Sequence, residues 1–243
     1  MSSIEPRAPL RPGDPAPDFV LPAVNSDGFV ALADYRGKSP VLLAMMRGLY
    51  CAFCRRHIAQ LGTTRQKLRA VGVEALAIVP MQLERLRLYY RFRPVSVPIA
   101  ADPNMATHRA YGVPQPPLTP DIVRAVESKY VDLAGRLQIA STDLAGIKDA
   151  LCQQDGFQPI EAELKDRRDW SDQYGGQMIG QFLVDRDGIV RWANIEGEKE
   201  GLRGLEQFPA DNEFLAAAQQ LVGRAMVRDC GMPRALHAPK SMP

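Results

Sequence analysis

The stretch that decides the fold is 41–54, which reads VLLAMMRGLYCAFC. Its first part, 41–46, is a short continuous apolar run, which is typical of a strand buried on both faces of a sheet. From Phe53 to about Ala70 the apolar residues have helical spacing, so that Ile58 and Leu61 fall near one face. The two cysteines therefore lie where a buried strand gives way to a helix.

Two cysteines three positions apart at such a junction, Cys51 and Cys54, favour redox chemistry. The first sulfur would lie among unpaired backbone N–H groups at the positive end of the helix dipole, an environment that lowers a thiol pKa and supplies thiolate at neutral pH. The second cysteine would lie one turn further in, where it can attack a mixed disulfide and release the product. Arg47, Arg55 and Arg56 add positive charge, so we expect them to lower the pKa of Cys51 further.

A structural or inert cysteine pair and a zinc site are the two other interpretations of this motif. His57 extends it to Cys-x2-Cys-x2-His, but zinc usually takes four protein ligands in a structural site, and the sequence has no second CxxC or histidine pair. We therefore expect no metal and no bound cofactor. His57 is either a proton shuttle or a hydrogen-bonded surface residue. Cys152, alone in a predicted helix, is either a distant resolving thiol or a small buried hydrophobe.

Outward from this stretch, the pattern alternates between strands and helices. We predict a strand pair at 19–21 and 30–32, strands at 73–79 and 97–101, a hairpin at 181–184 and 189–192, and helices at 82–92, 105–111 and 214–227. Pro98 makes the strand at 97–101 an edge strand. This order predicts an α/β sandwich. The predicted organisation is an extended arm (1–18), a main domain (19–113 and 177–228), a helical insertion (114–176) and a tail (229–243).

The insertion breaks the alternation. It opens with a proline-rich turn at 114–117 and then shows helical patterns at 121–137, 142–152 and 160–170. It could form a lid, a dimer contact or a docking surface. Its apolar positions need burial, which a homodimer would provide.

Composition excludes several classes of partner. The chain has 243 residues, enough for one core with an appendage. Lys+Arg 30 against Asp+Glu 28 leaves a net charge of +2, which gives no electrostatic case for nucleic acid or an anionic membrane. No apolar run reaches the roughly 18–20 residues that a transmembrane helix needs, and the N-terminus lacks a secretory pattern. We expect a cytoplasmic protein.

Several segments resemble the peroxiredoxin-like branch of the alkyl hydroperoxide reductase/thiol-specific antioxidant (AhpC/TSA) family. They are GDPAPDF at 13–19, LADYRGK at 32–38, RGLYCAFCR at 47–55 and FLVDRDG at 182–188. The resemblance implies a thioredoxin-like sandwich and a thiol–disulfide oxidoreductase or thiol-dependent peroxidase. Cys51 would attack a disulfide or peroxide, Cys54 would close the disulfide, and a thioredoxin- or glutathione-type thiol would reset the pair. Cys230 stands where some relatives keep a resolving thiol.

The resemblance also suggests which residues surround the sulfur. Arg47 would stabilise the thiolate or the peroxide oxygens, unless it is a solvated loop charge. Gly48, Tyr50 and Met178 would shape the substrate surface, unless Tyr50 only packs on the sheet edge. Met178 stands near the place of a thioredoxin-type proline.

Neither cysteine is preceded by the threonine of the usual Pro-x-x-x-Thr-x-x-Cys pattern. Two alternatives to a general redox enzyme therefore stay open. One is a redox-inactive binding or scaffold module with this fold. The other is a specialised enzyme acting on a small molecule bound under the insertion.

Overall fold

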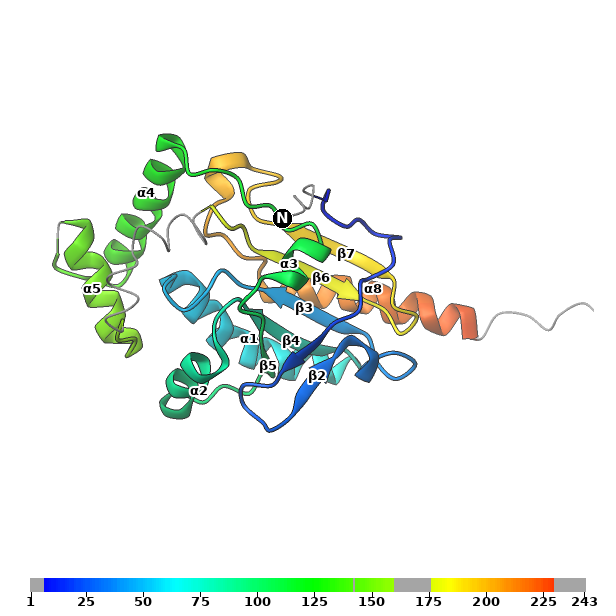
Figure 1. The fold of residues 1–243 in the computed structure, drawn as a ribbon. Coiled ribbons are helices and arrows are strands. Elements are labelled where there is room, and N and C mark those ends of the chain that lie inside the picture. The colour runs from blue at the N-terminus through cyan, green and yellow to red at the C-terminus, as the bar shows by residue number, and fades with distance from the viewer. Residues whose placement is uncertain (1–6, 142, 160–175, 230–243) are drawn as a thin grey trace, which may run out of the picture.

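The computed structural model describes residues 7–141, 143–159 and 176–229 (Figure 1). In this part of the chain a five-stranded sheet has the order β5-β4-β3-β6-β7. The neighbours β5, β4 and β3 are parallel to one another, whereas β6 is antiparallel to both β3 and β7. The strand bounds are β3 Val41–Met45, β4 Glu74–Val79, β5 Ile99–Ala101, β6 Gly180–Val184 and β7 Val190–Ile195. The predicted α/β sandwich, its hairpin and its edge strand β5 are confirmed.

The central strand β3 is buried on both faces, as its unbroken apolar run predicts. Leu42 and Ala44 point into a core with α1 (Ala52–Ala70) and α8 (Asp211–Asp229), which lie together behind the sheet in Figure 1. Leu43 and Met45 point to the opposite core, in front of which α3 (Ala106–Ala110) lies. Full burial stabilises a leucine side chain by roughly 1.5–3 kcal/mol, so the strand that leads to the cysteines is firmly anchored.

The N-terminal part packs against the sheet edge and α3. The Leu10 N–H donates to the Tyr111 carbonyl at 3.1 Å, and Pro15 pairs with Ile189. The Leu10 side chain is buried in the core on the α3 side. The strand pair that follows, β1 (Val20–Pro22) and β2 (Phe29–Ala31), is antiparallel as predicted.

The stretch 114–176 contributes two helices, α4 (Pro120–Arg136) and α5 (Leu144–Asp155), close to the predicted ranges. Thr119 and Asp143 cap them by accepting from the N–H groups of Ile122 and Gly146 at 3.3 and 2.8 Å. The third predicted helix, at 160–170, lies outside the described residues. Figure 1 shows α4 and α5 together beyond one end of the sheet, past the start of α1.

Both helices join the core around α1. Tyr130 and Leu133 of α4 and Leu151 of α5 are buried there, next to Phe53 and Ile58 of α1. These three apolar side chains are thus buried within the chain, whereas Val123 and Val131 of α4 are exposed. A further helix, α2 (Leu83–Phe92), borders the same core. No helix in the described ranges has the length and apolarity required to traverse a bilayer.

Candidate active site

Cys51 caps the first turn of α1. Its backbone is extended (φ −81°, ψ 114°), and its Sγ accepts the N–H of Cys54 at 3.3 Å, as a serine or aspartate oxygen does at most helix starts. Both cysteines are free thiols, and their exposed fractions are 2% and 0%. The sequence-predicted juxtaposition of the two sulfurs with the helix N-terminus is present.

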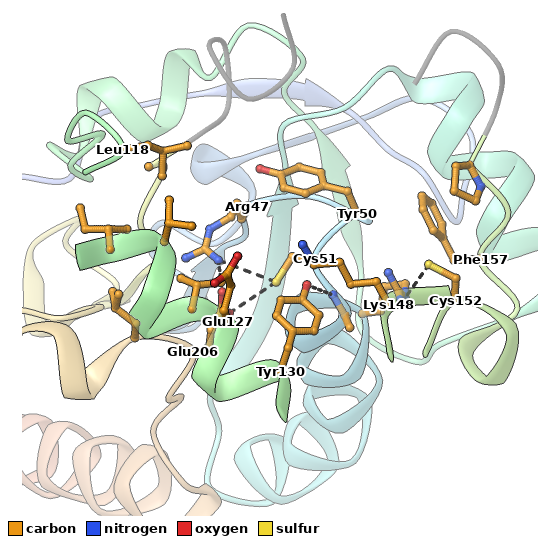
Figure 2. A pocket seen from close by; sticks show the side chains of 18 of the residues that line it. Arg47, Tyr50, Cys51, Leu118, Glu127, Tyr130, Lys148, Cys152, Phe157 and Glu206 are labelled. Atoms are coloured by element: carbon orange, nitrogen blue, oxygen red, sulfur yellow. Dashed lines mark hydrogen bonds and ion pairs between the residues drawn. The ribbon is translucent and has the colours of Figure 1, made fainter. Parts of the chain in front are cut away.

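Arg47 contacts the Cys51 sulfur and two buried carboxylates, Glu196 and Glu206. Figure 2 shows it beside Cys51 and Glu206. Its Nη1 is 3.9 Å from Cys51 Sγ and also pairs with Glu206, while its Nη2 lies 2.6 Å from Glu196 Oε2. Its Nε donates to the Gln177 carbonyl at 2.6 Å. Arg47 is therefore not a solvated loop charge but the centre of a buried charge cluster.

Glu206 touches the sulfur directly. Its Oε2 lies 3.5 Å from Cys51 Sγ, so that the thiol donates a hydrogen bond to it. Its backbone has a positive φ of 59°, which is uncommon for a residue other than glycine and clusters at functional sites. Glu196 holds the backbone of Glu206, because Glu196 Oε1 accepts the Glu206 N–H at 2.7 Å.

The expectation of a lowered Cys51 pKa is wrong. Burial raises the pKa of this thiol well above its ordinary value, and Cys54 and Glu206 raise it further, with only Arg47 acting in the opposite sense. Arg55 and Arg56, expected to help, both pair with Asp155 at 2.8 Å. Burial and the neighbouring Glu206 carboxylate therefore favour the neutral thiol of Cys51 over its thiolate.

A cavity of about 420 Å³ opens over Cys51. Figure 2 shows Tyr50 and Phe157 on its upper side and Tyr130 of α4 below the sulfur. Tyr50 and Met178, predicted to shape the substrate surface, line this cavity.

Gly48, predicted in the same role, is not among the residues that line the cavity. Its φ is +141°, and a Cβ there would lie 2.5 Å from Tyr50 Cε1. Glycine is needed here to make room for the Tyr50 ring, so Gly48 acts on the cavity only through Tyr50.

Arg55 connects the cysteine loop to the insertion. Its Nη1 donates to the Leu49 carbonyl at 2.7 Å, its Nε bonds Asp155 at 2.9 Å, and its guanidinium lies 4.9 Å from the centre of the Phe157 ring. Cys152 lines the same cavity half-buried, with its sulfur 4.0 Å from Arg55 Nη2, and burial raises its pKa. It is neither a fully buried hydrophobe nor distant from the site. Cys230 lies outside the described residues.

His57 is buried rather than on the surface. It stacks on Phe208 with ring centroids 3.9 Å apart, and burial lowers its pKa to about 3. Within the described ranges neither ring nitrogen has a hydrogen-bond partner, so the geometry gives His57 a packing role and not that of a proton shuttle. His108 Nε2 instead bonds the Met46 carbonyl at 2.9 Å and fixes the end of β3. The described residues contain no group of three or more potential metal ligands.

Sequence reasoning missed Glu196 and Glu206. Both follow β7, about 150 residues after Arg47, in a segment without a recognisable motif. The one available signal was Arg47 itself, because an arginine next to a buried strand needs a buried counter-charge.

Comparison with solved structures finds proteins of similar fold. A reduced 2-Cys peroxiredoxin of Plasmodium vivax aligns with a TM-score of 0.54 at 15% identity, over 88% of this chain and 98% of that one. Peroxidoxin BcpB of Mycobacterium tuberculosis gives 0.52 at 12% identity, over 87% and 98%. A Chlorobium tepidum protein assigned as a thiol:disulfide interchange protein DsbE gives 0.50 at 21% identity, over 88% and 98%. These likenesses confirm the thioredoxin-like fold.

No curated protein sequence matches the chain. The model of the AhpC/TSA family, however, matches residues 12–193, which include Cys51, Cys54, Arg47 and the helices α4 and α5. The match covers most of the chain and agrees with the resemblance of the segments around Cys51. The chain therefore belongs to the AhpC/TSA family.

Proposed function

We propose that this protein is a dithiol oxidoreductase in which Cys51 attacks and Cys54 resolves. The observation that carries the proposal is the placement of Cys51. Its sulfur caps α1, accepts the Cys54 N–H at 3.3 Å and lies at the floor of an open cavity. Cys51 attacks a disulfide or peroxide that enters the cavity, and Cys54, with 0% exposure, then displaces the product by closing a Cys51–Cys54 bridge.

The oxidised pair needs an external thiol to reset it, and we assign this role to a thioredoxin- or glutathione-type reductant. We place the protein in the cytoplasm, where such thiols keep cysteines reduced. The rival function is a binding module that keeps the fold without turnover.

Bridge mapping tests the proposal. The reduced protein is treated with one equivalent of hydrogen peroxide or of a small disulfide, and the products are mapped by mass spectrometry. We expect a Cys51–Cys54 bridge in the wild type and in a Cys152→Ser control. Bridges that involve Cys152 or Cys230 instead would contradict the assignment of Cys54, and an unreactive Cys51 would favour the binding module.

We expect Glu206→Gln to lower the pKa of Cys51. The substitution removes the carboxylate that accepts the thiol hydrogen bond at 3.5 Å and raises the thiol pKa, while Arg47 keeps its favourable charge. More thiolate then exists at neutral pH. Since nucleophilicity falls as the pKa falls, alkylation at pH 7 should accelerate by about threefold for each unit of the decrease.

The measurement is the iodoacetamide rate of Cys51 against pH. The matched control is Glu213→Gln, which changes an exposed glutamate on α8 and should leave the profile unchanged. A slower reaction at an unchanged pKa would show that Glu206 promotes the attack as a base instead of holding the resting sulfur as a thiol.

A further inference from the structure

We propose that the cavity over Cys51 binds a neutral, apolar organic disulfide, and that α4 forms the wall that selects it. This inference rests on the proposed dithiol function and names the substrate class for the same site. It is carried by the depth of the sulfur, the residues of the cavity wall and the pairing of the charges around it.

The depth of Cys51 requires a substrate that enters the cavity. The side chain is 2% exposed, so the reacting bond must be brought down to the sulfur. The volume of about 420 Å³ is in the range of small-molecule sites. Hydrogen peroxide would leave nearly all of this space unfilled, whereas an organic body beside the reacting bond would fill it.

The wall of the cavity is mainly apolar. The helix α4 presents Ile122, Val123 and Val126 to it. Aromatic rings and further apolar side chains contribute to the lining, among them Tyr50, Tyr130, Phe157, Met178 and Leu205. An aromatic or branched aliphatic body is favoured against these side chains, because its apolar surface leaves water on binding.

The inner charges are already neutralised within the protein. Arg47 faces the two carboxylates of Glu196 and Glu206, and Arg55 faces Asp155. Two further carboxylates, Glu127 and Asp149, line the cavity beside Lys148. Among the described lining residues the acidic groups thus balance the basic ones, and the site offers no cationic recess for an anionic substrate. A neutral substrate fits this balance better than a polyanionic one.

The donors around the sulfur favour an S–S bond over an O–O bond. Heterolysis of a peroxide puts negative charge on a leaving oxygen that needs strong hydrogen-bond donors. Arg47, the guanidinium beside Cys51, already donates to the Gln177 carbonyl, Glu196 and Glu206, and its Nη1 also lies 3.9 Å from Cys51 Sγ. Of its five N–H groups, these contacts leave one for a leaving oxygen. A leaving thiolate spreads its charge over a larger atom and depends less on such donors.

The reaction balances with the two cysteines alone. The Cys51 thiolate attacks one sulfur of R–S–S–R, which forms a Cys51–S–S–R bond and releases R–S⁻. The Cys54 thiolate then attacks the Cys51 sulfur, which forms the Cys51–Cys54 bridge and releases the second R–S⁻. Both leaving thiolates take up the protons that the cysteines lost. The two cysteines are oxidised, and one disulfide is reduced to two thiols.

The first test compares neutral and charged probes of similar size. The reduced protein reacts in stopped flow with a neutral dipyridyl disulfide and with the doubly anionic dithiobis-nitrobenzoate, and each rate is divided by the rate of that probe with a free small thiol. We expect the normalised rate for the neutral probe to be about tenfold higher or more. Equal normalised rates would overturn the selectivity for neutral molecules.

The second test narrows the cavity from α4. Val123 lines the cavity and is 39% exposed, while Val131 on the same helix is 55% exposed and does not line it. We expect Val123→Trp to slow the reaction with the dipyridyl disulfide by about tenfold and to leave the rate with hydrogen peroxide within about twofold. Val131→Trp should change neither rate. An equal loss with both oxidants in Val123→Trp, or no loss with either, would contradict α4 as a selective wall.

A third arm separates this inference from the proposed function. An apolar aromatic hydroperoxide that oxidises the pair faster than the dipyridyl disulfide would overturn the assignment of the S–S bond. Rapid Cys51–Cys54 bridging without any preference among the probes would overturn the substrate class alone. Failure of Cys51 to react with any probe, iodoacetamide included, would overturn the dithiol function itself.

Discussion

Replacing Arg47 with leucine should lower the free energy of unfolding by about 3–5 kcal/mol, because it leaves two buried carboxylates without their cation. Glu196 and Glu206 have side-chain exposures of 2% and 1%, so solvent cannot take over the role of the guanidinium. Burial and the neighbouring Glu196 already raise the pKa of Glu206 in the presence of Arg47. Without Arg47 this pKa should rise further, and the carboxyl would remain protonated to a higher pH.

The loss of stability in Arg47→Leu should depend on pH. A group whose pKa is higher in the folded than in the unfolded state stabilises the fold when protonated, and this contribution is lost as the pH rises through the folded-state value. The loss in Arg47→Leu should therefore shrink as the pH is lowered from 7 to 5. Urea unfolding at both pH values measures this loss of stability.

The control variant is Arg124→Leu. It breaks an exposed ion pair with Asp121 and should lower the free energy of unfolding by no more than about 1 kcal/mol. Equal losses for the two variants would show that the Arg47 cluster is not a stabilising unit.

Replacing Cys54 with serine should stop the redox cycle after one step. Cys51 can still attack a disulfide in this variant, but the buried thiol that displaces the product is gone. We expect a mixed disulfide on Cys51 to accumulate to about one adduct per chain. With an excess of a reductant that reacts slowly with this adduct, we expect the variant to lose multiple turnover. Intact-protein mass spectrometry measures the adduct, and peptide mapping places it.

Cys152→Ser is the matched control, since it removes a thiol of the same cavity and should keep full turnover. Unimpaired turnover in Cys54→Ser would show that another thiol resolves the adduct. Cys152 on the cavity wall would be the first to test, by combining the two substitutions.

Local sequence features predicted the elements that depend on neighbouring residues. The unbroken apolar run of β3, the turn signal at 185–188 and the helical spacing after Phe53 each gave an element close to its observed bounds. The position of Cys51 and Cys54 at a strand-to-helix junction followed from the same local pattern, because the capping geometry needs only the residues 51–54. Even the two helices of the insertion were predicted, since their periodicity and caps are local.

The charges at the site could not be predicted in this way. Glu206 contacts Arg47 across 159 positions of sequence, and Asp155 reaches Arg55 across 100. Composition shows that acidic residues exist, but it does not show which of them the fold buries. The same gap explains the error in the Cys51 pKa and the burial of His57, because depth below the surface is set by α4, α5 and the segment after β7 together.

Asp155 makes the stretch 114–176 part of the structure that holds the cysteine helix α1. Asp155 is the last residue of α5, and its carboxylate pairs with both Arg55 and Arg56 of α1. The centre of the Tyr130 ring of α4 lies 5.1 Å from the centre of the Phe53 ring. Excising the stretch would leave the buried Arg55 guanidinium without its counter-ion and would open the first turn of the cysteine helix to water. The stretch 114–176 therefore cannot be removed as a separate module. A shortened variant would need new residues at the start of α1 to keep its two thiols in place.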